Sequence, residues 1–190
     1  MYKFFAYLNR MKYIKRWGLM YCSVDENIME HSQHVAVVAH ALATISNTYF
    51  GGSLNADHIA VKALFHETSE VLTGDLPTPI KYFNPEIRDA YKGLERISND
   101  KLLGYLPAEM STVYDEIVND EDSIEHKFVK YADKICAYVK CVEEVKMGNR
   151  EFVKAEKSLK GELSKLGSKE VDYFVEHFIP AYSLTLDEME

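Results

Sequence analysis

Four side chains in this 190-residue chain have the chemistry of metal ligands: His31, the adjacent pair His66 and Glu67, and Asp133. Each lies in a stretch whose apolar pattern predicts a helix. A charged side chain is costly to bury unless it is paired, hydrogen-bonded or bound to a metal. Two imidazoles and two carboxylates from three helices can hold one divalent cation, and such a cation can activate water for hydrolysis.

The four residues differ in how well a purely structural role explains them. A single histidine on an apolar helix face is more often a packed core residue than a ligand. Asp133 is harder to explain in that way, because its helical neighbours Val129, Cys136 and Ala137 are apolar. Glu70 is expected one helical turn beyond His66, where it can position or deprotonate a water. The alternatives for Glu70 are a solvated carboxylate at a helix end or a partner for a histidine N–H.

The hydrophobic pattern has helical spacing throughout, and no segment has the alternating pattern of a strand. Asn27 and Glu30 form a predicted capping box, Asp57 is the expected N-cap of the next helix, and Pro77 and Pro79 make 73–79 a rigid loop. The chain is therefore expected to be all-α. The predicted helices cover residues 2–13, 28–48, 58–72, 85–103, 107–118, 122–147, 150–166 and 168–178.

The composition excludes several classes of protein. The formal net charge of −8 argues against a nucleic-acid binder, which needs a basic face. No apolar run approaches the roughly 20 residues of a membrane span, so no membrane partner is expected. The basic, aromatic N-terminus lacks the features of a signal peptide, and the three scattered cysteines fit reduced thiols in the cytoplasm. Residues 1–190 are expected to form a single domain.

The ligand order His, His-carboxylate, Asp is that of the HD-domain metal phosphohydrolases, and the chain resembles one branch closely, the bacterial 5′-deoxynucleotidases, over essentially its whole length. A bare H-[DE] dipeptide is weak evidence, but many further blocks occur in order. They are Arg16-Trp17, E-H-S-x-x-V-A-x-V-A-H-A-L around His31, F-G-G at 50–52, H-E-x-S-E-V-L-T-G-D-L-P-T-P from His66 to Pro79, K-Y-F-N at 81–84, and A-D-x-x-C-A-Y-x-K-C-x-E-E from Ala132 to Glu144.

The resemblance implies an HD-domain helical bundle that hydrolyses deoxyribonucleoside 5′-monophosphates, usually as a homodimer. It makes His31, His66, Glu67 and Asp133 the ligands of one divalent metal ion. It also implies that Arg16 orients the phosphate and that Trp17 lines the sugar pocket, where it can exclude a 2′-hydroxyl. The nucleotide is expected to contact the loop Asp75-Leu76-Pro77-Thr78 together with the residues around the metal. Arg16, Glu70 and Asp75 are the candidate catalytic residues, and Glu70 and Asp75 are not ranked between the water and the leaving group.

The chain departs from the family at one ligand, because Glu67 stands where the superfamily has an aspartate. The extra methylene leaves three alternatives open: an active variant with altered metal choice or rate, an inactivated enzyme, or a nucleotide-binding protein without turnover. A different HD-type phosphohydrolase activity is a further alternative. The donor set suits Co, Mn, Zn, Ni, Fe or Mg, and the sequence does not distinguish among them.

Overall fold

The computed structural model describes residues 1–120 and 122–190, and within these ranges every regular element is a helix. The all-α prediction is therefore confirmed. The elements are α1 (Phe4–Leu8), η1 (Asn9–Tyr13), α2 (Ile28–Tyr49), α3 (Ala56–Leu64), α4 (Glu70–Thr73), α5 (Thr78–Lys81), α6 (Pro85–Leu103), α7 (Ala108–Val118), α8 (Ile124–Lys146), η2 (Arg150–Phe152), α9 (Val153–Leu163), α10 (Lys169–His177), η3 (Ile179–Ser183) and η4 (Asp187–Met189).

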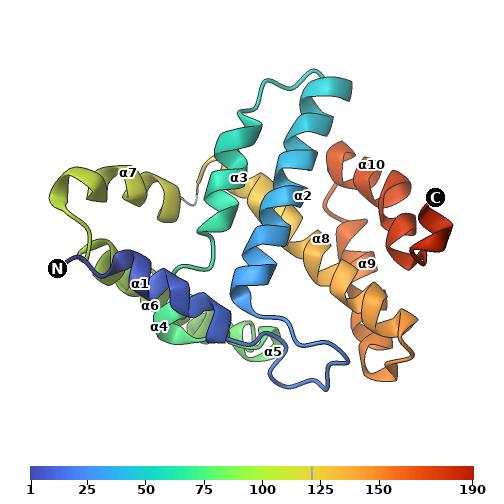
Figure 1. The fold of residues 1–190 in the computed structure, drawn as a ribbon, viewed down its shortest axis with the longest axis horizontal. Helices are drawn as coiled ribbons and strands as arrows, with labels where there is room; N and C mark the ends of the chain where they lie inside the picture. The colour runs from blue at the N-terminus through green and yellow to red at the C-terminus, as the bar shows by residue number, and fades with distance from the viewer. Residues whose placement is uncertain (121) are drawn as a thin grey trace.

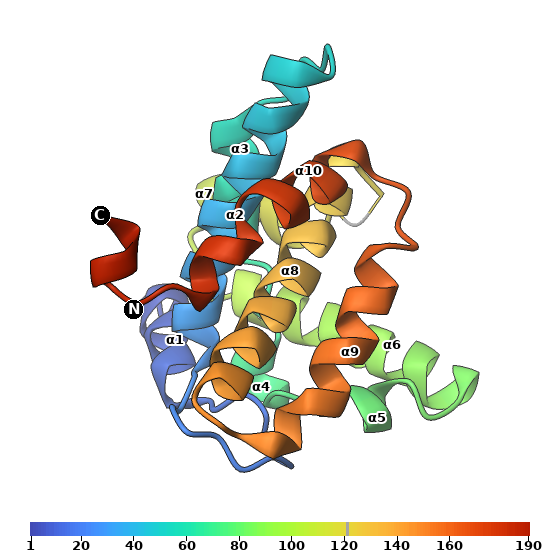
Figure 2. The ribbon, with the colours of Figure 1, turned by 90° about the vertical axis from the view of Figure 1, so that its right-hand side faces the viewer.

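Three helices, α2, α3 and α8, form the centre of the molecule. α2 and α3 lie side by side with α8 packed against both (Figure 1), and α9 and α10 pack on the other sides of α8 and α2 (Figure 2). Apolar side chains from all three helices, including Leu42, Ile59 and Ile135, are fully buried between them. Burying an aliphatic side chain of this size contributes about 1.5–3 kcal/mol. This packing fixes α2 and α8, which carry two of the predicted ligands.

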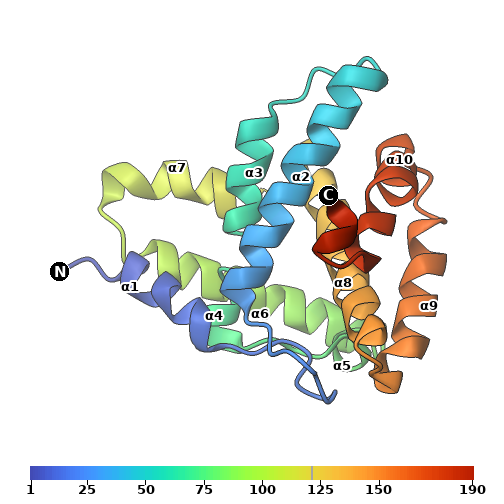
Figure 3. The same ribbon diagram turned by 45° about the vertical axis from the view of Figure 1, so that its right-hand side comes forward.

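A smaller apolar cluster joins the N-terminus to the middle of the chain. Phe4 of α1 is fully buried against Leu102, Leu103 and Leu106, which follow each other at the end of α6 and just beyond it. Figure 3 shows α1 and α7 on the side of α2 and α3 that faces away from α10. The segment after α1 is thereby brought back across the molecule toward the start of α2.

The N-terminus of α2 has the predicted capping box. The Asn27 side chain accepts from the backbone N–H groups of Met29 and Glu30, and the Glu30 side chain accepts from the Asn27 N–H. A capping box satisfies amide groups that the first helical turn leaves without partners. It starts α2 at Ile28 and so places His31 within the first turn, close to the loop before the helix.

The predicted helix over 58–72 is wrong in its second half. α3 begins after an Asn55 cap rather than at Asp57, and it ends at Leu64. His66 Nδ1 donates to the Ala63 carbonyl at 2.7 Å, and Thr68 Oγ1 donates to the Phe65 carbonyl at 2.7 Å. These side chains occupy carbonyls that the next helical turn needs, which is the known competition of polar side chains with helix bonds. Residues 65–69 form tight turns instead, and α4 starts anew at Glu70.

Other boundaries differ by less. The predicted helix over 2–13 is α1 followed by a 3₁₀ turn, and that over 150–166 begins with a 3₁₀ turn and ends at Leu163. The predicted loop over 73–79 is confirmed only over 74–77, because α4 ends at Thr73 and α5 starts at Thr78 with Pro79 in its first turn, where a missing N–H costs nothing. In the described part of the chain, no helix combines the length and the apolar character that crossing a bilayer requires.

Candidate metal centre and phosphate site

The first two predicted ligands come from α2 and from the turn after α3. His31 lies on the buried side of the first turn of α2 and is 1% exposed. His66 and Glu67 lie where α3 has ended, so they reach the site from a turn and not from the predicted helix face. The two imidazole rings face each other with their centres 5.3 Å apart. The turn therefore brings the histidines together despite the wrong helix prediction.

Asp133 of α8 completes the cluster. His31 Nε2 lies 3.0 Å from Asp133 Oδ1 and 3.9 Å from Glu67 Oε1. One ligand atom from each of His31, His66, Glu67 and Asp133 lies within 4.8 Å of the others. Ligands at about 2.0–2.2 Å from a central ion lie at most about 4.4 Å apart, so these atoms are within a few tenths of an ångström of the separations that one shared ion requires. The structure thus brings together the four residues that the sequence predicts as ligands.

The protonation of His66 shows that the cluster fits a cation. Its Nδ1 donates to the Ala63 carbonyl, so in a neutral ring Nε2 carries a lone pair. That Nε2 is buried without a hydrogen-bond partner among the described residues and lies 3.1 Å from Glu67 Oε1. Two lone pairs at this distance repel each other, and a proton or a metal ion between them removes the repulsion. The donor set and its fixed tautomer are those of a divalent-metal site.

Arg16 lies beside this cluster, held by the segment that precedes α2. Its backbone N–H donates to the Glu26 carbonyl at 2.9 Å, next to an isolated bridge between Lys15 and Asn27. Its Nη1 lies 3.8 Å from Glu67 Oε1. Burial works against the charge of Arg16, but the carboxylates of Asp133, Glu67 and Glu26 together raise the pKa of its guanidinium. A buried, permanently charged arginine next to the four candidate metal ligands is suited to binding phosphate.

Trp17 follows Arg16 in an unusual backbone conformation. Its φ of +61° lies in the left-handed region, and it is the only described residue other than glycine with a positive φ. Such a conformation costs roughly 1–3 kcal/mol and persists only where the surroundings impose it. The indole Nε1 donates to Glu26 Oε2 at 2.9 Å, and the ring meets Phe152 edge-to-face at 5.3 Å. Trp17 is half-buried, and so it is not simply packed in the core.

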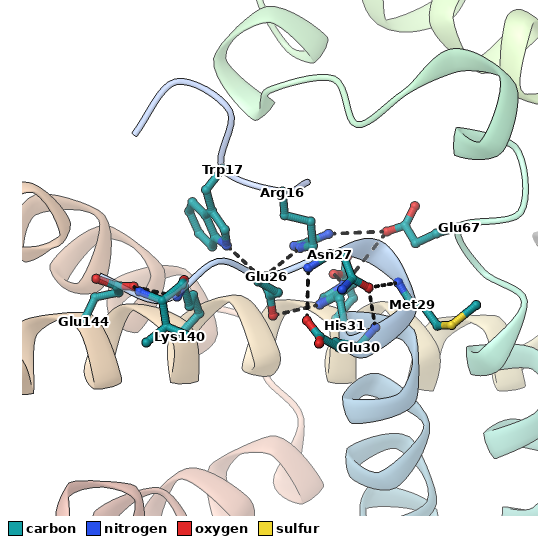
Figure 4. A network of polar contacts seen from close by, with 12 residues as sticks. Arg16, Trp17, Glu26, Asn27, Met29, Glu30, His31, Glu67, Lys140 and Glu144 are labelled. Atoms are coloured by element: carbon teal, nitrogen blue, oxygen red, sulfur yellow. Dashed lines mark hydrogen bonds and ion pairs between the residues drawn. The ribbon is translucent and has the colours of Figure 1, made fainter. Parts of the chain in front are cut away.

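Glu26 is the residue that the sequence prediction missed. Its Oε2 accepts from both Arg16 Nε and Trp17 Nε1, and its Oε1 lies 3.9 Å from His31 Nδ1 (Figure 4). No local pattern marks it, because its partners lie ten and nine residues upstream and act through a loop. The feature of the sequence that could have indicated Glu26 is its position one residue before the Asn27 capping box.

Glu70 and Asp75, the other two candidate catalytic residues, lie against the same cluster. Glu70 is buried, so the alternative of a solvated helix-end carboxylate is wrong. Burial and the carboxylates of Glu67 and Asp75 raise the pKa of Glu70 to about 10. Gly74, with φ +75°, ends α4 and turns the chain into the loop that carries Asp75. Burial raises the pKa of Asp75 despite the opposing charge of Arg16.

The remaining predicted substrate contacts lie in the loop between α4 and α5. Leu76 and Pro77 are half-buried, and Thr78 is exposed at the start of α5. The backbone N–H of Trp17 also hydrogen-bonds to Asp75 and opposes the rise in its pKa, so this loop starts next to the Arg16-Trp17 segment. The contact of Leu76, Pro77 and Thr78 with a nucleotide stays a prediction.

A second buried polar cluster, the anchor cluster of Lys140, Glu144 and Asn149, holds the loop between Trp17 and Glu26. Glu144 accepts from the backbone N–H groups of Ser23 and Val24 and from the side chains of Lys140 and Asn149. Lys140 Nζ donates to the Val24 carbonyl at 2.6 Å, and Figure 4 shows this pair on α8 beside the Trp17 segment. Burial alone raises the pKa of Glu144, but these hydrogen bonds outweigh it and lower the pKa to about 2.

Comparison with known proteins identifies the family. Residues 3–182 match the model of the family described as 5′-deoxynucleotidase YfbR-like. The 5′-deoxynucleotidase YfbR of Shigella boydii serotype 18 is 48% identical over 98% of this chain and 94% of its own length. The 5′-deoxynucleotidase YfbR of Escherichia coli O1:K1 is also 48% identical, with the same coverage of both chains.

Solved structures show the same fold. An HD-domain phosphohydrolase from Listeria innocua superposes with a TM-score of 0.83 at 22% identity, over 95% of this chain and 88% of that one. The cyanophage S-2L HD phosphohydrolase DatZ, described with dA and one catalytic Zn²⁺ ion, superposes with a TM-score of 0.61 at 19% identity, over 94% and 95%. At these identities the likeness concerns the fold alone. The helical bundle, the four-residue cluster and the family match agree, and the chain belongs to the YfbR-like 5′-deoxynucleotidase family of HD-domain phosphohydrolases.

Proposed function

We propose that this protein hydrolyses deoxyribonucleoside 5′-monophosphates to a deoxyribonucleoside and phosphate, with one divalent metal ion at His31, His66, Glu67 and Asp133. The observation that carries the proposal is the position of Arg16, whose Nη1 lies 3.8 Å from Glu67 Oε1 at the edge of the ligand cluster. A phosphate monoester needs positive charge on its oxygens and an activated water next to phosphorus. When bound, the metal ion supplies Lewis acidity and lowers the pKa of a water.

Arg16 supplies the remaining positive charge. Its Nε is engaged by Glu26, so the terminal nitrogens are left to face the cluster and to bind phosphate oxygens as a planar pair. The half-buried Trp17 follows it directly and is proposed to line the sugar side of the pocket. Steric exclusion of a 2′-hydroxyl there gives selectivity for deoxyribose.

Glu70 and Asp75 are proposed to carry the two proton transfers. Attack by water forms a new P–O bond and releases a proton, and cleavage of the bond to the 5′-oxygen requires a proton on the leaving group. The raised pKa of Glu70, about 10, suits a carboxyl that holds a proton in the resting site, and the charge of Arg16 favours the ionised form of Asp75 although burial opposes it. The pH profiles of activity in single variants of Glu70 and of Asp75 show which residue carries which proton transfer.

Glu67 is proposed to retain metal binding despite its extra methylene. Its Oε1 lies 3.1 Å from His66 Nε2 and 3.9 Å from His31 Nε2, so the longer side chain reaches the ligand cluster. A protein without turnover is therefore the less favoured alternative.

The test is phosphate release from a panel of deoxy- and ribonucleoside 5′-monophosphates. Metal-stripped protein is supplemented singly with Co²⁺, Mn²⁺, Zn²⁺, Ni²⁺, Fe²⁺ or Mg²⁺, beside a Glu67→Asp variant. The proposal predicts metal-dependent release that favours the deoxy series in the parent chain. Release only from Glu67→Asp means that the parent has lost turnover at this ligand. No release from either protein contradicts the proposed activity.

The metal, the oligomeric state and the cellular location are further proposals. Cobalt and manganese are the proposed activating ions, because imidazole and carboxylate ligands accept both and the panel separates them from the other four. A homodimer is proposed from the resemblance to the family, and light scattering on the purified protein tests it. A cytoplasmic location stays a prediction, supported by the three free cysteines, which fit a reducing compartment.

A further inference from the structure

One carboxylate serves both residues that are proposed to bind the substrate. Glu26 Oε2 accepts from Arg16 Nε at 3.1 Å and from Trp17 Nε1 at 2.9 Å (Figure 4). The side chains of Arg16 and Glu26 are 12% and 15% exposed, so water competes little for these bonds. Hydrogen bonds to a charged acceptor in such surroundings are among the stronger ones in proteins.

The backbone of Glu26 holds the same segment. Its carbonyl accepts from the Arg16 N–H at 2.9 Å, next to the bridge between Lys15 and Asn27. Main chain and side chain of one residue therefore fix Arg16 from two directions. The capping box that begins at Asn27 ties this arrangement to the start of α2 and so to His31.

The bond to Nε also determines which edge of the guanidinium is free. With Nε directed at Glu26, the two terminal nitrogens point away from it, and Nη1 lies 3.8 Å from Glu67 Oε1. The free edge thus faces the ligand cluster, where a phosphate is proposed to bind. Without Glu26, the flexible arginine side chain can rotate that edge away.

The hydrogen bond from the Trp17 indole to Glu26 acts on the side of the pocket that is proposed to hold the sugar. Trp17 has a strained backbone, and its ring is held by Glu26 on the polar edge and by Phe152 on the apolar side. Loss of the hydrogen bond removes the polar contact that resists rotation of the ring. A steric filter against a 2′-hydroxyl works only while the ring that forms it stays in place.

We propose that Glu26 is a positioning residue that aligns Arg16 with the phosphate and Trp17 with the sugar, and that it thereby sets the selectivity for deoxyribose. This inference rests on the proposed nucleotidase function. It adds a residue to which neither the sequence motifs nor the family resemblance assigns a role.

Two variants and a matched control test the proposal. Glu26→Ala removes both hydrogen bonds, and Glu26→Gln keeps an amide oxygen that can accept from the same donors without the charge. Asp25→Asn is the control, because it makes the same charge change on the neighbouring residue, whose ion pair with Lys15 is exposed. Metal content and thermal unfolding are measured on all proteins, which separates loss of the metal or of the fold from loss of alignment.

The first readout needs no substrate. Trp17 is the only tryptophan, so quenching of the intrinsic fluorescence by acrylamide reports the freedom of this ring alone. The proposal predicts stronger quenching in Glu26→Ala, intermediate quenching in Glu26→Gln and the parent value in Asp25→Asn. Parent quenching in Glu26→Ala contradicts the proposal whether or not the protein has nucleotidase activity.

The second readout is the ratio of kcat/KM for a deoxyribonucleotide to that for the matching ribonucleotide. Losing two hydrogen bonds to a charged group is expected to lower kcat/KM for the deoxyribonucleotide roughly tenfold to hundredfold. The deoxy-to-ribo ratio is expected to fall toward unity in Glu26→Ala, with partial rescue in Glu26→Gln. Equal losses on both substrates, with the ratio unchanged, mean a purely structural role and overturn the proposal. If the parent lacks turnover, the same ratio is taken from nucleotide dissociation constants.

Discussion

Two buried polar clusters lie on either side of the loop that carries Arg16 and Trp17, and they differ in how fully their hydrogen bonds are satisfied. In the anchor cluster, Glu144 accepts from backbone and side-chain donors alike. In the ligand cluster, the buried His66 Nε2 has no hydrogen-bond partner among the described residues. Native proteins leave few buried polar atoms unpaired, and such atoms need an explanation. The anchor cluster is complete without a ligand, whereas the ligand cluster needs a cation.

Substituting Asp133 should separate activity from stability in the ligand cluster. Asp133→Ala removes a proposed metal ligand, and since a bound metal supplies several kcal/mol of transition-state stabilisation, we expect phosphate release to fall by about a thousandfold or more. The unfolding free energy of the metal-free protein should fall by only about 1–3 kcal/mol, because the lost contact with His31 is partly offset by lost repulsion from Glu67. Phosphate assays and urea unfolding in a chelator measure the two effects.

Substituting Glu144 should affect stability more than activity, the opposite of the expectation for Asp133. Glu144→Ala leaves Lys140 buried without its carboxylate, and breaking a buried pair costs about 3–5 kcal/mol of unfolding free energy. The double variant Lys140→Met with Glu144→Leu should cost less, since apolar groups of similar volume leave no unpaired charge. Urea unfolding checks both. A Glu144→Ala protein as stable as the parent shows that this cluster does not hold the loop.

Truncating Trp17 should change specificity more than stability. Trp17→Ala opens the proposed sugar side of the pocket, so activity on ribonucleotides should rise relative to deoxyribonucleotides by roughly tenfold to hundredfold. This substitution does not relieve the backbone strain at position 17, because alanine is no better suited than tryptophan to a φ of +61°. Paired kcat/KM measurements on matching nucleotides give the ratio, and an unchanged ratio assigns the selectivity to another residue.

The pH dependence of the unfolding free energy should show that Glu144 of the anchor cluster is ionised and hydrogen-bonded in the folded protein. The pKa of Glu144 is about 2 in the folded protein, below its ordinary value of 4.5. Because the pKa of Glu144 is lower in the folded than in the unfolded protein, its ionised carboxylate stabilises the folded protein fully above pH 4.5. This stabilisation is lost as the pH falls toward 2. The difference in unfolding free energy between the parent and Glu144→Gln should therefore shrink across this range. A difference that stays constant with pH shows that Glu144 is not ionised in the folded protein.

The sequence predicted the long helices, and which four residues of the ligand cluster lie together, better than it predicted how the backbone presents these residues. The helical spacing along α2 and α8 follows from burial against neighbours, which apolar residues report directly. The end of α3 depends instead on bonds from His66 and Thr68 to backbone carbonyls, and hydrophobic spacing does not report these. Glu26 acts through partners 9 and 10 residues upstream, and Glu144 binds the Ser23 backbone 121 residues away, so no local pattern predicts that these two residues hold the loop.

The most direct test of the difference between the two clusters is calorimetric titration of Co²⁺ or Mn²⁺ into metal-free protein, beside Asp133→Ala and Lys140→Met with Glu144→Leu. The account predicts one ion per chain in the parent and in the double variant, and loss of that binding in Asp133→Ala. Absence of binding in the parent, or binding that persists unchanged in Asp133→Ala, contradicts the assignment of the ligand cluster as the metal centre.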